Sequence, residues 1–137
     1  MGVTSNRSGL HLRISLASGF SLGPGKADLL SGIRDTGSIA AAGRRMKMSY
    51  KRAWSLVEEM NAAFSQPLVE TSRGGQARGG AALTETGERV LAAYDRMRRQ
   101  TREAVAGEVA ALEKLLAGAV GHSDMSQSDM PRSDMSD

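Results

Sequence analysis

The sequence contains no cysteine, two histidines and five aromatic residues among its 137 residues. Without cysteine there is no disulfide framework, no thiolate zinc site and no cysteine nucleophile. His11 and His122 stand near opposite ends of the chain, so the sequence offers few histidines for a metal cluster or a Ser-His-Asp triad. No phosphate-binding loop is visible either. We therefore expect a protein that is not an enzyme and that holds no metal and no cofactor.

Long hydrophobic runs are also absent. No apolar stretch approaches the roughly 18 residues that span a bilayer, and the N-terminus lacks the apolar segment of a secretory signal. We expect no membrane contact and a cytoplasmic location. Because aromatic residues are so few, the core has to be built from Leu, Val, Ile, Met and many Ala.

Charge is distributed unevenly along the chain. The formal net charge is +3, but residues 122–137 hold four aspartates and one arginine, so residues 1–121 carry +6. The acidic end repeats Ser-Asp-Met at residues 123, 128 and 133. A polar, repetitive segment without core-forming residues other than Met predicts a disordered tail. Its methionines could coordinate a soft metal, but a solvated tail is the ordinary interpretation.

The spacing of apolar residues predicts a mostly helical fold with a small β component. Alternation of apolar and polar residues over 10–16 predicts a half-buried strand, which a glycine-rich turn follows. Gly37 is suited to the left-handed residue after a helix, and Ser38 and Ser49 are suited to N-caps. The predicted helices span residues 26–35, 39–46, 50–64 and 85–117.

A β-hairpin and a long helix are predicted after Pro67. Residues 68–71 and 81–83 form the expected strands, with a glycine-rich tip between them. Thr84 is the expected N-cap of the last helix, and Gly87 is expected to let this helix pack closely. About 30 helical residues are too many to bury against so small a domain, and the simplest partner is a second copy of the chain.

Residues 38–61, SIAAAGRRMKMSYKRAWSLVEEMN, have the organisation of a helix-turn-helix. Met46 and Met48 supply apolar residues for the turn, and polar side chains begin the second helix, whose N-terminal residues enter the major groove in this motif. Trp54 is expected in the core or partly buried. Small residues for the crossing of the two helices are Ala41, Ala42 and Ala53.

Basic residues are concentrated in the same segment. Between Gly43 and Val57 there are five basic residues and no acidic one, and the helix dipole adds positive potential at the helix N-terminus. Arginine and glycine at the hairpin tip are suited to a phosphate or a narrow minor groove. The predicted DNA contacts are Arg44, Arg45, Lys47, Ser49, Tyr50, Lys51, Arg52, Ser55, Arg73, Gln76 and Arg78.

The run SIAAAGRRMKMSYKRAWSLVEEMN, followed by PLVETSRGG and ALTETGERVL, resembles the winged helix-turn-helix domain of LysR-type regulators. It is more similar to the ModE-type molybdate-responsive regulators, through Ser49-Tyr50-Lys51 before Ala53-Trp54, through Glu59-Met60-Asn61 and through the extended wing GGQARGGAALT. The resemblance covers about residues 10–105. It implies a dimeric DNA-binding repressor or activator whose long helix helps to form the dimer with the N-terminal strand and first helix.

Full-length ModE regulators carry C-terminal oxyanion-binding domains after this helix, whereas about twenty residues follow Ala117 here. We therefore expect no small-molecule effector site and no direct molybdate binding. A winged-helix protein-interaction module without specific DNA readout is the alternative, and it would show little affinity for duplex DNA at low salt. The expected organisation is a flexible N-terminus (1–9), a winged helix-turn-helix (10–83), a dimerisation helix (84–117) and a disordered acidic tail (118–137).

Overall fold

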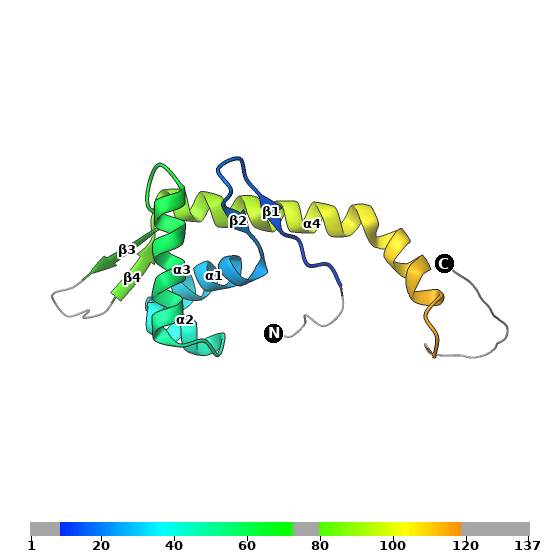
Figure 1. Ribbon diagram of the computed structural model, residues 1–137, viewed down its shortest axis with the longest axis horizontal. Helices are drawn as coiled ribbons and strands as arrows, with labels where there is room; N and C mark the ends of the chain where they lie inside the picture. The colour runs from blue at the N-terminus through cyan, green and yellow to red at the C-terminus, as the bar shows by residue number, and fades with distance from the viewer. Residues whose placement is uncertain (1–8, 73–79, 119–137) are drawn as a thin grey trace. The chain divides into compact units, whose positions relative to one another are not determined.

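The computed structural model describes residues 9–72 and 80–118 (Figure 1). In chain order the elements are β1 (Ile14–Ser15), β2 (Ser21–Leu22), α1 (Pro24–Thr36), α2 (Ile39–Arg45), α3 (Tyr50–Ala63), β3 (Val69–Ser72), β4 (Gly80–Leu83) and α4 (Glu85–Lys114). The strands form two separate antiparallel pairs. The predicted class, mostly helical with a small β component and a long last helix, is confirmed.

The chain divides into two compact units between Arg99 and Gln100, within α4. The first unit contains every other helix and strand together with the start of α4. The second unit contains the rest of α4 and the turn that ends at Gly118. The expected flexible N-terminus and acidic tail fall almost wholly outside the described residues.

The core of the first unit is aliphatic, as the composition predicts. Leu29, Leu30 and Ile33 of α1 are fully buried, and so are Met60 of α3 and Tyr94 of α4. A buried tyrosine needs a partner for its polar tip, and the Tyr94 hydroxyl donates to the Leu12 carbonyl oxygen at 2.7 Å. Burial raises the pKa of Tyr94, so the phenol stays protonated and keeps donating.

The strand predicted over residues 10–16 is wrong in length. Only Ile14–Ser15 belong to a ladder, paired with Ser21–Leu22, a segment that the sequence pattern assigned to a turn. The chain reverses between them, where the Leu16 N–H donates to the Phe20 carbonyl oxygen at 2.8 Å. Because the hairpin closes there, Leu16 stays 39% exposed although it follows the alternating pattern.

The helix ends follow the predicted caps. Pro24 begins α1, and Gly37 adopts φ 74° after it and donates its N–H to the Ile33 carbonyl oxygen at 2.8 Å. Ser38 caps α2 by accepting the Ala41 N–H at 3.0 Å. These local signals are confirmed because capping depends on side chains within one helical turn.

The predicted hairpin is confirmed in its strands. β3 and β4 pair in register from Val69 opposite Leu83 to Ser72 opposite Gly80. The Ala81 N–H donates to the Gly37 carbonyl oxygen at 2.9 Å, which joins the hairpin to the connection between α1 and α2. The hairpin is therefore held at its base by the helical part of the fold.

Leu68 joins the end of α3 to β3 and α4. Its N–H donates to Asn61 Oδ1 at 2.8 Å, and Asn61 Nδ2 donates to the Val69 carbonyl oxygen at 3.1 Å. The Leu68 carbonyl oxygen accepts the Thr84 N–H at 2.9 Å. Thr84 also caps α4, since its Oγ1 accepts the Gly87 N–H at 2.9 Å.

Gly87 lies directly against this junction. A Cβ added at Gly87 would overlap the Leu68 carbonyl oxygen and would lie 3.0 Å from the Leu68 carbonyl carbon. Both neighbours are backbone atoms that other hydrogen bonds hold in place, so they have little freedom to move. The expectation that Gly87 permits close packing is confirmed.

We predict that Gly87→Ala lowers the free energy of unfolding by about 1–3 kcal/mol, because the methyl group forces the start of α4 away from Leu68. Gly107→Ala is the matched control in the same helix, since a Cβ there meets no heavy atom within 4 Å. That control should gain up to about 1 kcal/mol from the higher helix propensity of alanine. Urea denaturation followed by circular dichroism measures both, and equal stability of the two variants would contradict the packing described for Gly87.

Candidate nucleic-acid interface

The helices α2 and α3 cross closely because the residues between them are very small. A Cβ added at Gly43 would lie 3.1 Å from the Cβ of Ala53. Ala53 is fully buried at this crossing, as expected, whereas Ala42 is buried against Gly32 of α1 and Ala41 is only half-buried. The close contact thus depends on a glycine that the alanine pattern did not single out.

The turn between the helices, residues 46–49, is closed by its own backbone. The N–H groups of Met46 and Met48 both donate to the Gly43 carbonyl oxygen at 3.0 Å. The side chains of Met46 and Met48 are partly buried against the core, in agreement with the predicted filling of the turn. This arrangement sets the direction in which α3 leaves the turn.

Lys47 adopts φ 59° in this turn and is the one residue other than glycine with positive φ among residues 9–72 and 80–118. The left-handed region costs an L-residue roughly 1–2 kcal/mol because Cβ approaches the carbonyl oxygen. The Lys47 side chain is exposed. A position that suits glycine therefore carries a cation instead.

One face of α3 is buried and another is open. Ala53, Leu56, Val57 and Met60 face the core. Ser49 caps the helix by accepting the Arg52 N–H at 3.0 Å, as predicted. The predicted contact residues at the start of the helix all lie on its exposed surface, and they are Tyr50, Lys51, Arg52 and Ser55.

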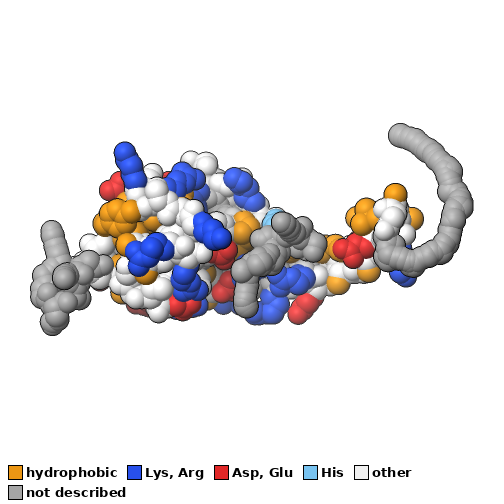
Figure 2. All heavy atoms as spheres, turned by 90° about the horizontal axis from the view of Figure 1, so that it is seen from below, with side chains coloured by type: hydrophobic (Ala, Val, Ile, Leu, Met, Phe, Trp, Pro, Cys, Tyr) orange, Lys and Arg blue, Asp and Glu red, His pale blue; other side chains and the backbone are white. Residues whose placement is uncertain are grey.

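The predicted cations of the helix-turn-helix are all exposed. Arg45 is partly neutralised, because its Nη1 lies 3.6 Å from Asp35 Oδ2. Among residues 9–72 and 80–118, no ion pair is found for the other four, Arg44, Lys47, Lys51 and Arg52. Seen from below the view of Figure 1, Lys and Arg side chains border hydrophobic side chains on the face of the first unit that is turned to the viewer (Figure 2).

Within the described part of the chain, the acidic residue Glu59 near the C-terminal end of α3 has an ion-pair partner, unlike most cations at the N-terminal end. Glu59 Oε2 lies 3.2 Å from Lys26 Nζ, which also lies 4.8 Å from the centre of the Phe20 ring. Lys26 therefore acts within the fold and offsets an acid on α3. The unpaired positive charge is left at the N-terminal end of the helix, where the helix dipole has the same sign.

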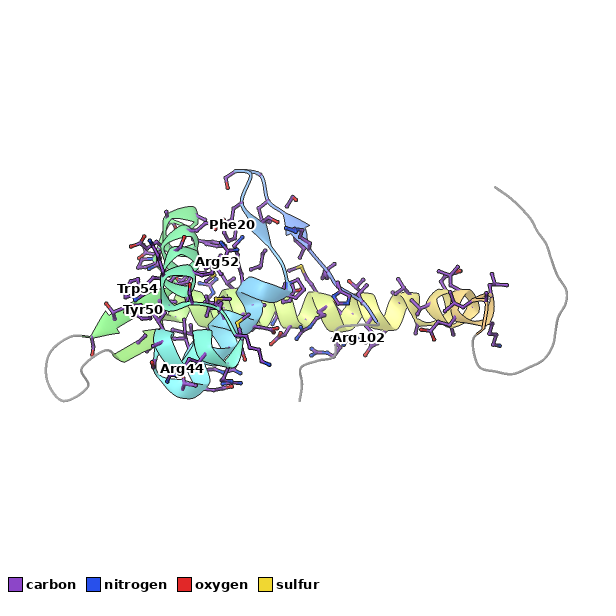
Figure 3. All side chains as sticks on the ribbon, turned by 60° about the horizontal axis from the view of Figure 1, so that its bottom comes forward. Phe20, Arg44, Tyr50, Arg52, Trp54 and Arg102 are labelled. Carbon is purple, nitrogen blue, oxygen red and sulfur yellow. The ribbon has the colours of Figure 1, made fainter. Side chains whose placement is uncertain are left out.

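Trp54 is the site residue that the predicted contact set omits. It is half-buried and stacks edge-on against Tyr50, with ring centres 6.2 Å apart and an interplanar angle of 77°. Both rings lie on one side of α3, and Arg52 lies on another (Figure 3). The spacing of four residues was the available signal, since such residues are neighbours on a helix.

The wing residues of the predicted interface, Arg73, Gln76 and Arg78, lie outside the described residues.

Within residues 9–72 and 80–118, no group of three or more His, Asp and Glu side chains could hold a metal ion. In the same part of the chain, no helix has both the length and the apolar character needed to cross a membrane.

Comparison with known proteins agrees with this geometry. Residues 28–88 match the family described as bacterial regulatory helix-turn-helix protein, lysR family. This segment runs from α1 through the helix-turn-helix and the hairpin to the start of α4, so it contains every described residue of the candidate interface. Over this segment, which is less than half of the chain, the sequence is similar to that family.

Two curated relatives are similar over the same region. The chain is 46% identical over 76 residues to the molybdenum-pterin-binding protein MopB of Rhodobacter capsulatus, covering 56% of this chain and 28% of that protein. It is 40% identical over 93 residues to the transcriptional regulator ModE of Haemophilus influenzae, covering 68% and 36%. The chain spans about a third of the length of these relatives, and the predicted ModE-like resemblance is confirmed.

A solved structure shares the fold. CbnR_DBD, crystallised in a complex with DNA, superposes with a TM-score of 0.52 at 21% sequence identity, covering 64% of this chain and 94% of that one. At this identity the likeness shows the fold alone. The fold is a winged helix-turn-helix, as the sequence predicted.

We predict that Lys47→Gly raises the free energy of unfolding by up to about 1 kcal/mol, because glycine adopts the left-handed region without the Cβ clash. Lys47→Ala is the matched control, since it removes the same charge and keeps the unfavourable backbone conformation. Urea denaturation of both variants measures the difference. A glycine variant less stable than the alanine variant would show that Lys47 is not strained.

Proposed function

We propose that the protein is a cytoplasmic, sequence-specific DNA-binding transcriptional regulator that acts as a homodimer. In this proposal the N-terminal end of α3 lies in the major groove, and the hairpin β3–β4 lies against the flanking backbone or minor groove. Two copies of α3 would meet successive major grooves, so the half-sites would stand about 10 base pairs apart or a multiple of that. The protein binds DNA and carries out no chemical reaction on it.

One observation carries this proposal. The end of α2, the turn and the first turn of α3 together expose four cations without ion-pair partners among the described residues, on the surface that helix-turn-helix proteins turn toward DNA. Phosphate contacts supply most of the affinity in such complexes, and contacts with base edges supply specificity. Lys47 supports the same view, since a cation stands where the backbone favours glycine.

The roles of the predicted contacts follow from their positions. Arg44 and Arg45 end α2 and are assigned to phosphates. Lys51, Arg52 and Ser55 are on the exposed surface of α3 and are assigned to base edges, together with the Tyr50 hydroxyl. The wing contacts Arg73, Gln76 and Arg78 stay predictions of the sequence, as does the absence of molybdate binding, which calorimetric titration with molybdate checks.

We predict that Arg52→Ala weakens binding to a selected duplex by about 1–3 kcal/mol and relaxes specificity at one position of the site. Arg44→Ala should weaken all duplexes alike and reduce the slope of log affinity against log salt by about one. Arg96→Ala removes the same charge from α4 and serves as the control. The measurement is fluorescence anisotropy on duplexes selected from a random pool.

The binding measurement also decides between the two functions considered for the sequence. A protein-interaction module would select no duplex from the pool and would bind random duplexes weakly even at low salt. Loss of affinity in the control alone, with both helix-turn-helix variants unchanged, would place the interface elsewhere.

The proposal of a homodimer rests on the exposed apolar residues of the second unit, which begins at Gln100. Among the described residues from Gln100 onward, no other helix or strand accompanies α4 in its unit. This part of α4 carries apolar residues at helical spacing, namely Val105, Val109 and Leu112, and Leu116 follows just after the helix ends. Leu112 is 62% exposed and Leu116 equally so. Apolar residues three and four apart form one stripe along a helix, which suits burial against another copy.

We predict that Leu112→Glu shifts the protein from dimer to monomer, because a carboxylate would have to be buried in the shared stripe. Ala110→Glu introduces the same charge on the other side of α4 and should leave the dimer intact. Sedimentation equilibrium over a range of concentrations measures both. A monomeric wild-type protein, or a Leu112→Glu protein that stays dimeric, would refute this interface.

A further inference from the structure

Tyr50 and Trp54 form an apolar surface at the N-terminal end of α3. Tyr50 is 57% exposed, and Trp54 is half-buried with its inner part packed against the core. Their rings meet edge to face, with centres 6.2 Å apart. Within residues 9–72 and 80–118, no hydrogen bond ties the Tyr50 hydroxyl to another group.

The fold itself gives no reason for the exposed ring. Tyr50 is not among the core residues, whereas Trp54 is anchored to the core and holds the Tyr50 ring by the edge-to-face contact. Aromatic pairs of this geometry are favourable beyond the area they bury. The result is a rigid apolar wall that loses little rotamer entropy when something packs against it.

The surroundings of the aromatic pair identify what could pack against it. Lys51 adjoins Tyr50 in sequence and is exposed, and Lys47 is exposed in the preceding turn, whereas Arg52 is exposed on another side of α3 (Figure 3). A cationic border attracts a polyanion, and duplex DNA presents one apolar group on its base edges in the major groove, the C5-methyl group of thymine. An aromatic wall among cations therefore matches a thymine methyl group beside phosphates.

We propose that the Tyr50–Trp54 pair reads the C5-methyl group of thymine and is a determinant of sequence specificity. This inference rests on the proposed function and assigns a chemistry that polar readout by α3 does not include. The Tyr50 ring contacts the methyl group, and Trp54 acts through Tyr50 as a positioning residue and adds its exposed edge. Lys51 and Arg52 contribute hydrogen bonds and charge, which do not depend on the methyl group.

The test compares thymine with deoxyuridine, which pairs identically and lacks only the methyl group. A duplex is selected from a random pool with the full chain, and each thymine is then replaced singly by deoxyuridine. We expect at least one position in each half-site where the replacement lowers affinity about fourfold, the effect of exposing one methyl-sized apolar group. Anisotropy titrations at one salt concentration measure the ratio.

Variants show whether the aromatic pair is the reader. Tyr50→Ala should bring the thymine-to-deoxyuridine ratio at that position close to one, and Tyr50→Phe should restore it because the ring is kept. Trp54→Phe should lower the ratio partly, since the smaller ring supports Tyr50 less. Lys51→Ala is the control, because it should weaken both duplexes and leave their ratio unchanged.

The outcomes separate this inference from the proposed function. Specific binding with equal affinity for thymine and deoxyuridine duplexes, or an affinity difference that persists in Tyr50→Ala, overturns the inference and leaves the proposed function standing. Selection of no duplex at all overturns the proposed function and the inference with it. Retention of the ratio in Tyr50→Phe together with its loss in Tyr50→Ala supports the apolar reader.

Discussion

The positions of α1, α2 and α3 depend on two contacts between a glycine and an alanine. A Cβ at Gly32 would lie 3.0 Å from the Cβ of Ala42, and a Cβ at Gly43 would lie 3.1 Å from that of Ala53. Both distances are tighter than ordinary carbon contacts. The three helices therefore pack at a separation at which an alanine at either glycine would require its neighbour to move by a few tenths of an ångström.

The opposite end of α3 is held by hydrogen bonds instead of close packing. Asn61 accepts the N–H groups of Leu68 and Val69, and the Leu68 carbonyl oxygen accepts from Thr84 and lies against Gly87. These hydrogen bonds fix the C-terminal end of α3 to the chain that follows it. The Gly43–Ala53 contact thus holds the inner face near the N-terminal end of α3, and the hydrogen bonds hold its C-terminal end, while Tyr50, Lys51 and Arg52 stay exposed on the outer surface.

Much of the candidate interface could be predicted from the sequence, because the features that define it depend on residues close together in the chain. Ser38, Ser49 and Thr84 cap the helices that follow them, and the apolar spacing after Tyr50 shows which side of α3 is buried. Exposure of Tyr50 and of the cations follows from that spacing. The strand at Ser21–Leu22 could not be found in this way, since its pairing with Ile14–Ser15 is a contact between segments that lack a turn signal of defined type.

The order and type of the helices, the caps between them and the concentration of positive charge follow from local sequence, because each depends on residues within a turn or two of one another. The glycines at the helix crossings, the left-handed conformation of Lys47 and the support of Tyr50 by Trp54 became visible in the folded chain alone. These features depend on distances between elements, and such distances are set by packing over the whole core.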